Sequence, residues 1–272
     1  MKWRNEAMVT KGATMRSVEA LRRKHLKSAE VLYRKALREQ VAEVQKKLRQ
    51  VETVEGMLPI AESIVVDSVP IKKAMESVYV GVGGDFARTT YNNLTADKSK
   101  KDRGDDYFDD YMRRYVEEKT GDRIKTISET TREKMLQIVK STVGKALSEG
   151  LSVDEIRDIL QQKFANMVDY RAVRIARTEV ISASNAGSLQ GAISTGIAFK
   201  KVWLATKTGH TRKGHLEMMD KSVGVMEQFS VPIYDTKGAY LGSEKLNFPA
   251  DPNGSAGNVI NCRCTLVYEP IK

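Results

Sequence analysis

The sequence predicts an α+β protein, with a long and mostly helical N-terminal part followed by a small C-terminal module that contains β-strands. Two observations support this prediction. Residues 15–57 contain no proline, their only glycine is Gly56, and their apolar residues recur at helical spacing. From Phe199 onward, short strand-like segments separated by turn residues replace that spacing. With 272 residues, 41% of them hydrophobic, the chain is long enough for one or two domains with a real core.

The first predicted domain, residues 1–58, is a long amphipathic helix that forms a basic arm. Apolar residues follow a 4-3-4-3 spacing along one face of this helix at Leu37, Val41, Val44, Leu48 and Val51. Such a seam needs a partner helix. The spacing leaves open whether that partner lies in the same chain or in a neighbouring copy.

The second predicted domain, residues 59–119, is helical and variable. A helical segment is expected to run to Leu94, with an interruption near Gly81, Gly83 and Gly84. The polar run at about 95–106 is predicted to be a mobile loop, and a helix is expected over 107–119.

The third predicted domain, residues 120–272, divides into helices over 122–196 and a β-containing part over 197–272. Gly150 is expected to end one helix. Ser152 and Glu155 form a capping-box pattern that predicts a short helix to Phe164, with a further helix over 171–195. Strands are predicted at 200–205, 229–233, 239–241 and 259–268.

Positive charge is concentrated near the N-terminus. The whole chain carries +10, whereas residues 1–50 alone hold fourteen Lys and Arg against five acids. Such an arm favours a polyanion such as nucleic acid, and the alternative is a solvated helix face. The candidate nucleic-acid-binding residues are Arg22, Arg23, Lys24, Lys27, Arg34, Lys35, Arg38, Lys46, Lys47 and Arg49.

Two cysteines and two histidines form the weak candidate set for a metal site. Cys262 and Cys264 are two apart on the last predicted strand, roughly 6.6 Å between Cα atoms, which disfavours a disulfide between them. Both thiols could point at one Zn²⁺, with His210, His215 or both completing the site. The alternative is two small buried residues on the core face, and the default expectation is that no cofactor binds. So few cysteines also indicate a reducing compartment.

No catalytic residue is predicted from spacing alone. On the helix over 171–195, Thr178, Ser182 and Asn185 share a face that is expected to dock the helix under the β-containing part. Arg177 and Glu179 as catalytic groups are the weaker interpretation. No apolar run is long enough to span a membrane, and no apolar signal-peptide core follows the N-terminus.

In their order and spacing, residues of about 120–268 resemble the phage Mu F-like minor head proteins, also called phage head morphogenesis proteins. Members of that family often show an acidic residue shortly after the motif tryptophan, and this chain has none between Trp203 and Arg212. The motif positions, to which the resemblance assigns a structural role, are Arg177, Thr178, Glu179, Asn185, Trp203, Arg212, His215, Asn261, Cys262, Arg263 and Cys264.

The resemblance implies a non-enzymatic structural component of a tailed phage, bound at the portal vertex and close to packaged DNA, that assists head assembly and genome ejection. The implied partners are the portal protein, double-stranded DNA, a major capsid or scaffold protein, and further copies of the same chain. The implied location is the virion, in the head interior or at the portal vertex, after synthesis in the host bacterial cytoplasm.

Two alternatives from other classes remain. Modules of this kind also occur joined to toxin domains, so a nuclease or an ADP-ribosyltransferase is one alternative. We expect no additional domain after the module to hold such an activity. The other alternative is a zinc-stabilised nucleic-acid-binding module.

Overall fold

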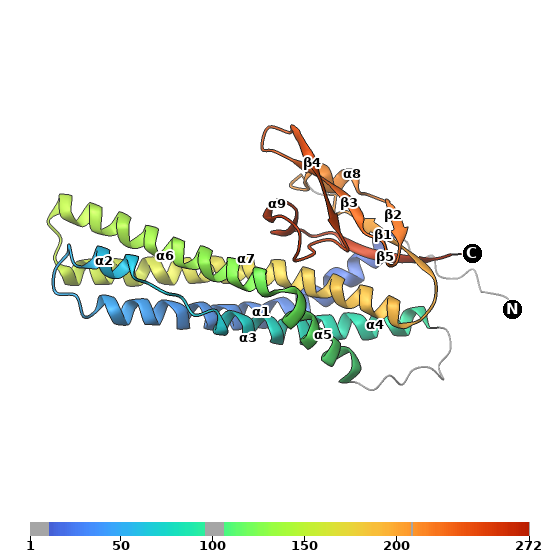
Figure 1. Ribbon diagram of the computed structural model, residues 1–272, viewed down its shortest axis with the longest axis horizontal. Helices are drawn as coiled ribbons and strands as arrows, with labels where there is room; N and C mark the ends of the chain where they lie inside the picture. Colours follow the sequence, from blue (N-terminus) through green and yellow to red (C-terminus); the bar gives the residue numbers. More distant parts are fainter. Residues whose placement is uncertain (1–10, 96–105, 208, 272) are drawn as a thin grey trace. The chain divides into compact units, whose positions relative to one another are not determined.

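The computed structural model describes residues 11–95, 106–207 and 209–271 (Figure 1). The predicted α+β class is confirmed: helices make up most of the first 194 residues, and five short strands follow. The loop predicted at about 95–106 lies outside the described residues, apart from its two end positions.

The chain divides into two compact units, each built from separate stretches of sequence. The first comprises Met1–Lys27, Glu76–Thr120 and Arg177–Lys272, and the second comprises Ser28–Met75 and Gly121–Ala176. Each unit draws residues from more than one of the three predicted domains.

In the second unit, the helix α1 (Lys11–Leu48) buries its predicted apolar seam. Leu37, Val41, Val44 and Leu48 are all at most 6% exposed within this single chain, so the partner helices belong to the same chain. The helix ends about nine residues earlier than predicted. Arg157 donates to the carbonyl oxygens of Arg49 (3.0 Å) and Val51 (2.9 Å). These carbonyls just after the helix therefore have hydrogen-bond donors without a further helical turn.

Polar contacts align the helices of the second unit. Gln40 on α1 donates to the carbonyl of Asp67 at 2.7 Å and to Ser128 at 3.4 Å on the helix α6 (Gly121–Glu149). Arg132 of α6 donates to the carbonyl of Ile64, just after the helix α2 (Met57–Glu62), at 2.6 Å. The unit is therefore a helix bundle with a buried apolar seam and with hydrogen bonds between its segments.

The helix α7 (Val153–Ser194) is one 42-residue helix, so the prediction of two helices in this region is wrong. The residues between Phe164 and Arg171 include no glycine or proline that would end a helix. The capping box at its start is confirmed, with Ser152 N–H donating to Glu155 at 2.8 Å and Glu155 N–H donating to Ser152 Oγ at 3.3 Å. No helix in the described part of the chain is long and apolar enough to cross a membrane.

Three helical segments run on from one another, and all but the first seven residues of this run belong to the first unit. The helix α3 (Val69–Val78) continues through the π-helical turn η1 (Tyr79–Gly83) into α4 (Gly84–Leu94), so the predicted interruption is a change of helix type rather than a break. The helix α5 (Asp106–Lys119) packs against this run. The C-terminal half of α7 approaches the run so closely that a Cβ at Gly187 would collide with the carbonyl oxygen of Gly83.

The strands form two small antiparallel sheets (Figure 1). The strand β1 (Phe199–Leu204) lies between β2 (Ser222–Gly224) and β5 (Thr265–Pro270), and β3 (Phe229–Tyr234) pairs with β4 (Tyr240–Leu246). Two short helices, α8 (Lys213–Glu217) and α9 (Ala256–Val259), were not predicted.

A buried, charged lysine lies on β1, the middle strand of the three-stranded sheet. Lys201 on β1 is only 1% exposed, with its Nζ 5.5 Å from the centre of the Phe229 ring, and burial lowers its pKa to about 8. Burial disfavours the charged form, so the folded state holds this proton less tightly than the unfolded state, whose reference pKa is 10.5.

Replacement of Lys201 by methionine is therefore expected to stabilise the fold by about 1–2 kcal/mol at pH 7. The advantage over the parent chain should shrink as pH rises from 8 towards 10.5, because the parent then loses the unfavourable charge. Urea unfolding of both chains across this range measures the difference. Lys200→Met, at the exposed neighbouring position, is the control. An advantage for Lys201→Met that is independent of pH would contradict the electrostatic explanation.

Candidate metal centre

The helix α8 presents a buried histidine to the interior of the first unit. His215 is 1% exposed, and its ring meets that of Trp203 edge to face with centres 5.5 Å apart. Gly214 allows the helix to approach β3, since a Cβ at this position would collide with the carbonyl oxygen of Pro232. The imidazole is therefore held between a short helix and the sheet.

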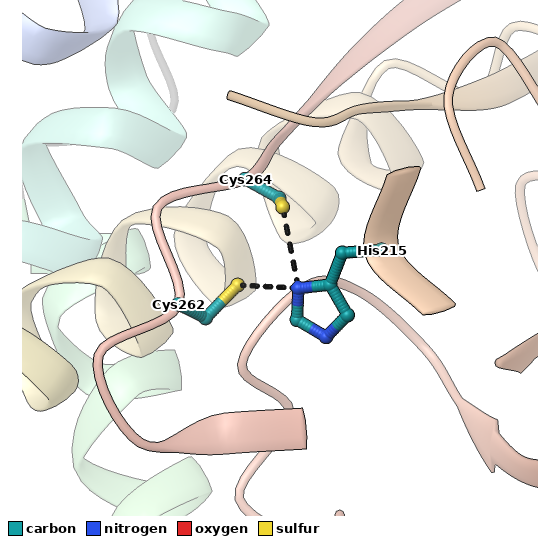
Figure 2. Close-up of side chains that lie close together, drawn as sticks. All are labelled: His215, Cys262 and Cys264. Atoms are coloured by element: carbon teal, nitrogen blue, oxygen red, sulfur yellow. Dashed lines mark hydrogen bonds between the residues drawn. The ribbon is translucent and has the colours of Figure 1, made fainter. Parts of the chain in front are cut away.

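Two thiols converge on the same ring nitrogen. Cys262 Sγ lies 3.7 Å and Cys264 Sγ 3.5 Å from His215 Nδ1, and the three atoms all lie within 4.8 Å of one another (Figure 2). All three side chains are buried, and both cysteines are free thiols. Among the described residues, this is the group of His, Cys, Asp and Glu side chains with the spacing of a metal site.

The two cysteines lie in the loop between α9 and β5, so their predicted place on a strand is wrong. Asn261 has a left-handed backbone conformation (φ 57°), which asparagine tolerates better than most residues, and it turns the chain before β5 begins. A loop can direct both side chains of a Cys-x-Cys pair to one point without the regular pleat of a strand.

A chain of hydrogen bonds between polar side chains determines which ring nitrogen of His215 carries the proton. Asn258 Nδ2 donates to Glu244 Oε1 at 2.6 Å, which orients the amide so that its oxygen faces His215 Nε2 at 3.2 Å. Because that oxygen can only accept, Nε2 carries the proton and Nδ1 directs its lone pair towards the two sulfurs. Asn258 and Glu244 were not predicted as site residues, since no sequence spacing links either to the histidine.

Hydrogen bonds from separate elements hold the loop that carries the cysteines. Thr178 Oγ1 accepts from the Asn261 N–H at 3.2 Å, and Asn185 Nδ2 donates to the carbonyls of Cys264 (3.2 Å) and Pro249 (2.8 Å). Two further side chains bind loop carbonyls: Thr206 donates to that of Arg263 at 2.9 Å, and Arg212 donates to that of Ile260. Several of the predicted motif positions therefore share one task, which is to shape this loop.

The side chain of Arg22, from α1, binds this loop and does not lie on the surface. Its guanidinium donates to Ser184 Oγ (2.8 Å), to Asn185 Oδ1 (3.0 Å) and to the carbonyl of Cys264 (3.3 Å), and the residue is only 7% exposed. The prediction that Arg22 contacts nucleic acid is wrong, because its charged group is buried. Burial lowers its pKa to about 10, and the neighbouring thiols of Cys262 and Cys264 oppose that decrease.

The thiols share their protons unequally. A hydrogen bond from Cys262 holds the pKa of the Cys264 thiol well below its usual value. The same hydrogen bond, together with burial, raises the pKa of the Cys262 thiol. The pair therefore gives up one proton readily and keeps the second.

The remaining predicted residues do not join the cluster. His210 is exposed in the turn before α8, Arg263 points its side chain to solvent, and Arg177 is half-buried. Glu179 is buried, with its Oε2 3.2 Å from the Tyr79 hydroxyl, which itself lies 2.7 Å from Ser182 Oγ.

Apart from Arg22 and Arg34, the predicted basic residues are exposed. Arg34 is half-buried and forms an ion pair with Asp169 of α7 at 2.7 Å. The fully exposed members of the predicted set are Arg23, Lys24, Lys27, Lys35, Arg38, Lys46, Lys47 and Arg49.

The fold and the site together define a class: an α+β module in which a long helix and a small sheet hold one buried Cys-x-Cys loop against a histidine. Residues 137–267 match the family model described as Phage Mu protein F like protein, which confirms the predicted resemblance over this part of the chain. The match supports a general role in phage head morphogenesis and, with it, a location in the virion.

Two curated relatives share about half of this chain. One is the "NAD(+)--arginine ADP-ribosyltransferase EFV" of Enterococcus faecalis, 33% identical over 140 residues, which are 50% of this chain and 26% of that protein. The other is the "Uncharacterized protein YqbB" of Bacillus subtilis, 27% identical over 132 residues, which are 48% of this chain and 40% of that protein. The chain thus matches less than half the length of either relative. No solved structure matches it.

Proposed function

We propose that this protein is a structural minor head protein of a tailed phage, bound at the portal vertex and close to the packaged DNA. In this role it assists head assembly and genome ejection, with the portal protein, a capsid or scaffold protein and other copies of itself as partners. The family match supports the phage head. The exposed cations of α1 are the observation that supports a position next to DNA.

The charges on α1 suit a polyanion that is bound without sequence specificity. Among the described residues, Lys24, Lys27, Lys35 and Arg38 are exposed and form no ion pair, so their charge is available to phosphates. A groove of about 810 Å³ beside α1 is lined by the cations Arg34, Lys35 and Arg38 and by the acids Glu39 and Asp169. Neutralising phosphates releases condensed counterions, which is the main source of non-specific affinity for DNA.

The position in the particle is tested by quantitative mass spectrometry of gradient-purified virions, with the portal subunit as the internal standard. We expect a low and fixed ratio of this chain to the portal subunit. Absence from mature particles would contradict a built-in head component and would leave a transient assembly factor or an enzyme.

The DNA contact is tested with a variant in which Lys24, Lys27, Lys35 and Arg38 are replaced by glutamine. We expect weaker binding to double-stranded DNA, and a plot of log K against log[salt] that is shallower by about 3–4, since each phosphate contact contributes about 0.9. Fluorescence anisotropy at several salt concentrations measures both.

The matched control removes the same number of positive charges elsewhere, by replacing four other exposed lysines with glutamine. If this control weakens DNA binding as much as the α1 variant does, net charge explains the affinity and the α1 contact is wrong. The control positions are Lys134, Lys221, Lys237 and Lys245.

A transferase activity is the second candidate, because one relative bears the name of an arginine ADP-ribosyltransferase. The match covers only 26% of that protein, which favours a shared module over a shared activity. Incubation of the purified chain with labelled NAD⁺ and an arginine-rich acceptor separates the two. Transfer of label above the level of a heat-inactivated sample would support the enzyme, and no transfer is expected for the structural protein.

A further inference from the structure

The structure presents a buried point where three metal-ligand atoms meet, and we propose that His215, Cys262 and Cys264 bind one Zn²⁺ ion there, with a solvent molecule as the fourth ligand. This centre would stabilise the C-terminal module. It is independent of the portal and DNA contacts proposed above, because its residues are buried away from the exposed cations of α1.

The distances agree with tetrahedral zinc. Bonds of about 2.3 Å from Zn²⁺ to sulfur and about 2.0–2.1 Å to nitrogen place the sulfur and nitrogen ligands about 3.6 Å apart. The two observed sulfur-to-Nδ1 distances are 3.7 and 3.5 Å. Two of the three distances between ligand atoms therefore match such a site, and the two sulfurs lie within 4.8 Å of each other.

Hydrogen bonds can join this cluster only one pair at a time. The chain of hydrogen bonds from Glu244 through Asn258 keeps the proton on Nε2, so Nδ1 has one lone pair and can accept from one thiol only. A cation at the centre uses that lone pair and both sulfurs at once. Thiolates with imidazole select zinc and other borderline or soft ions over Mg²⁺ and Ca²⁺, which prefer oxygen.

Hydrogen bonds from neighbouring residues hold the proposed ligands in place, as they do in metal sites. The amide of Asn258 fixes the imidazole as a second layer of contacts does in known zinc centres, and Arg22 and Asn185 fix the carbonyl of Cys264. Each thiol that becomes a ligand releases its proton to solvent, so zinc affinity should rise with pH. The two thiolates then balance the charge of the ion.

Elemental analysis of the full-length chain, purified without a histidine tag, tests the proposal. We expect about one Zn per chain, and a loss of zinc to background in Cys262→Ser, Cys264→Ser and His215→Gln. His210→Ala is the matched control, because this histidine is exposed and outside the cluster, and it should keep its zinc. Zinc lost in His210→Ala would overturn the proposed ligand set.

Two further measurements keep the proposal testable if the ligand variants do not fold. Co²⁺ added to the metal-stripped parent chain should produce a thiolate-to-cobalt charge-transfer band and the intense visible bands of a tetrahedral site. Asn258→Ala keeps all three ligands and should weaken zinc binding about 10–100-fold in competition with a chromogenic chelator. A folded parent chain with no zinc and no thiolate–cobalt band, or with a disulfide between Cys262 and Cys264, would overturn the proposal.

Discussion

Replacement of Gly187 by alanine is expected to destabilise the first unit by about 1–3 kcal/mol. A Cβ at this position would collide with the carbonyl oxygen of Gly83 and crowd its Cα and carbonyl carbon, so two helix backbones would have to move apart. Backbone cannot rotate out of the way as a side chain can, and overpacking of a close contact commonly costs this much. Gly191 makes the same approach to Ala87 one turn further along α7.

Gly144→Ala is the matched control for Gly187→Ala. Gly144 also lies inside a helix, but a Cβ there would meet nothing within 4 Å. Alanine should therefore stabilise this position by about 0.5–1 kcal/mol through helix propensity alone. Urea unfolding followed by circular dichroism measures both variants. Similar effects of the two substitutions would mean that α7 does not pack on η1 as described.

Asn185→Ala is expected to cost about 3–5 kcal/mol. The amide is fully buried, and it donates to the carbonyls of Pro249 and Cys264 while its oxygen accepts from Arg22. Alanine would remove the Asn185 donor from the carbonyl of Pro249, leave that of Cys264 with Arg22 as its donor, and take one acceptor from the buried guanidinium, and buried groups that lose a partner are not compensated for their lost hydration.

The control for Asn185→Ala removes a side-chain amide from the same helix. Gln190 is partly buried and donates only to Ser194, one turn along α7, at 3.2 Å, so Gln190→Ala should cost less than about 1 kcal/mol. Urea denaturation compares the two variants. A loss for Asn185→Ala no greater than that for Gln190→Ala would mean that its network does not hold the cysteine loop.

Sequence patterns predicted those parts of the fold that depend only on residues close together in the chain. The seam through Leu37 and Leu48 is a direct record of helical periodicity, and Gly150 ends its helix with a left-handed φ of 70°, as its position suggested. The sequence did not predict that α7 is continuous, because residues that are compatible with a helix do not by themselves show that the chain is helical there. The early end of α1 depends on Arg157, more than a hundred residues away.

The candidate site was predictable in residue type but not in arrangement. His215, Cys262 and Cys264 stood out as possible ligands from their chemistry. Their convergence depends on α8 and on the turn at Asn261, and neither leaves a periodic signal. The same limit applies to Arg22, which in sequence looks like any other cation of α1. Only the tertiary fold shows that it is the buried one.

The π-helical turn η1 also constrains how this chain can change length. A π-helical turn holds one residue more than the α-helical turn that it replaces, so removing one residue from it can restore an ordinary α-helix, whereas a deletion within an α-helix rotates everything beyond it by about 100°. Here a deletion in α4 ahead of Ala87 would carry Ala87 away from Gly191. Gly81 is exposed and a Cβ there would meet nothing, so this position should accept many substitutions. A one-residue deletion within η1 should therefore destabilise the first unit less than a one-residue deletion in α4 ahead of Ala87.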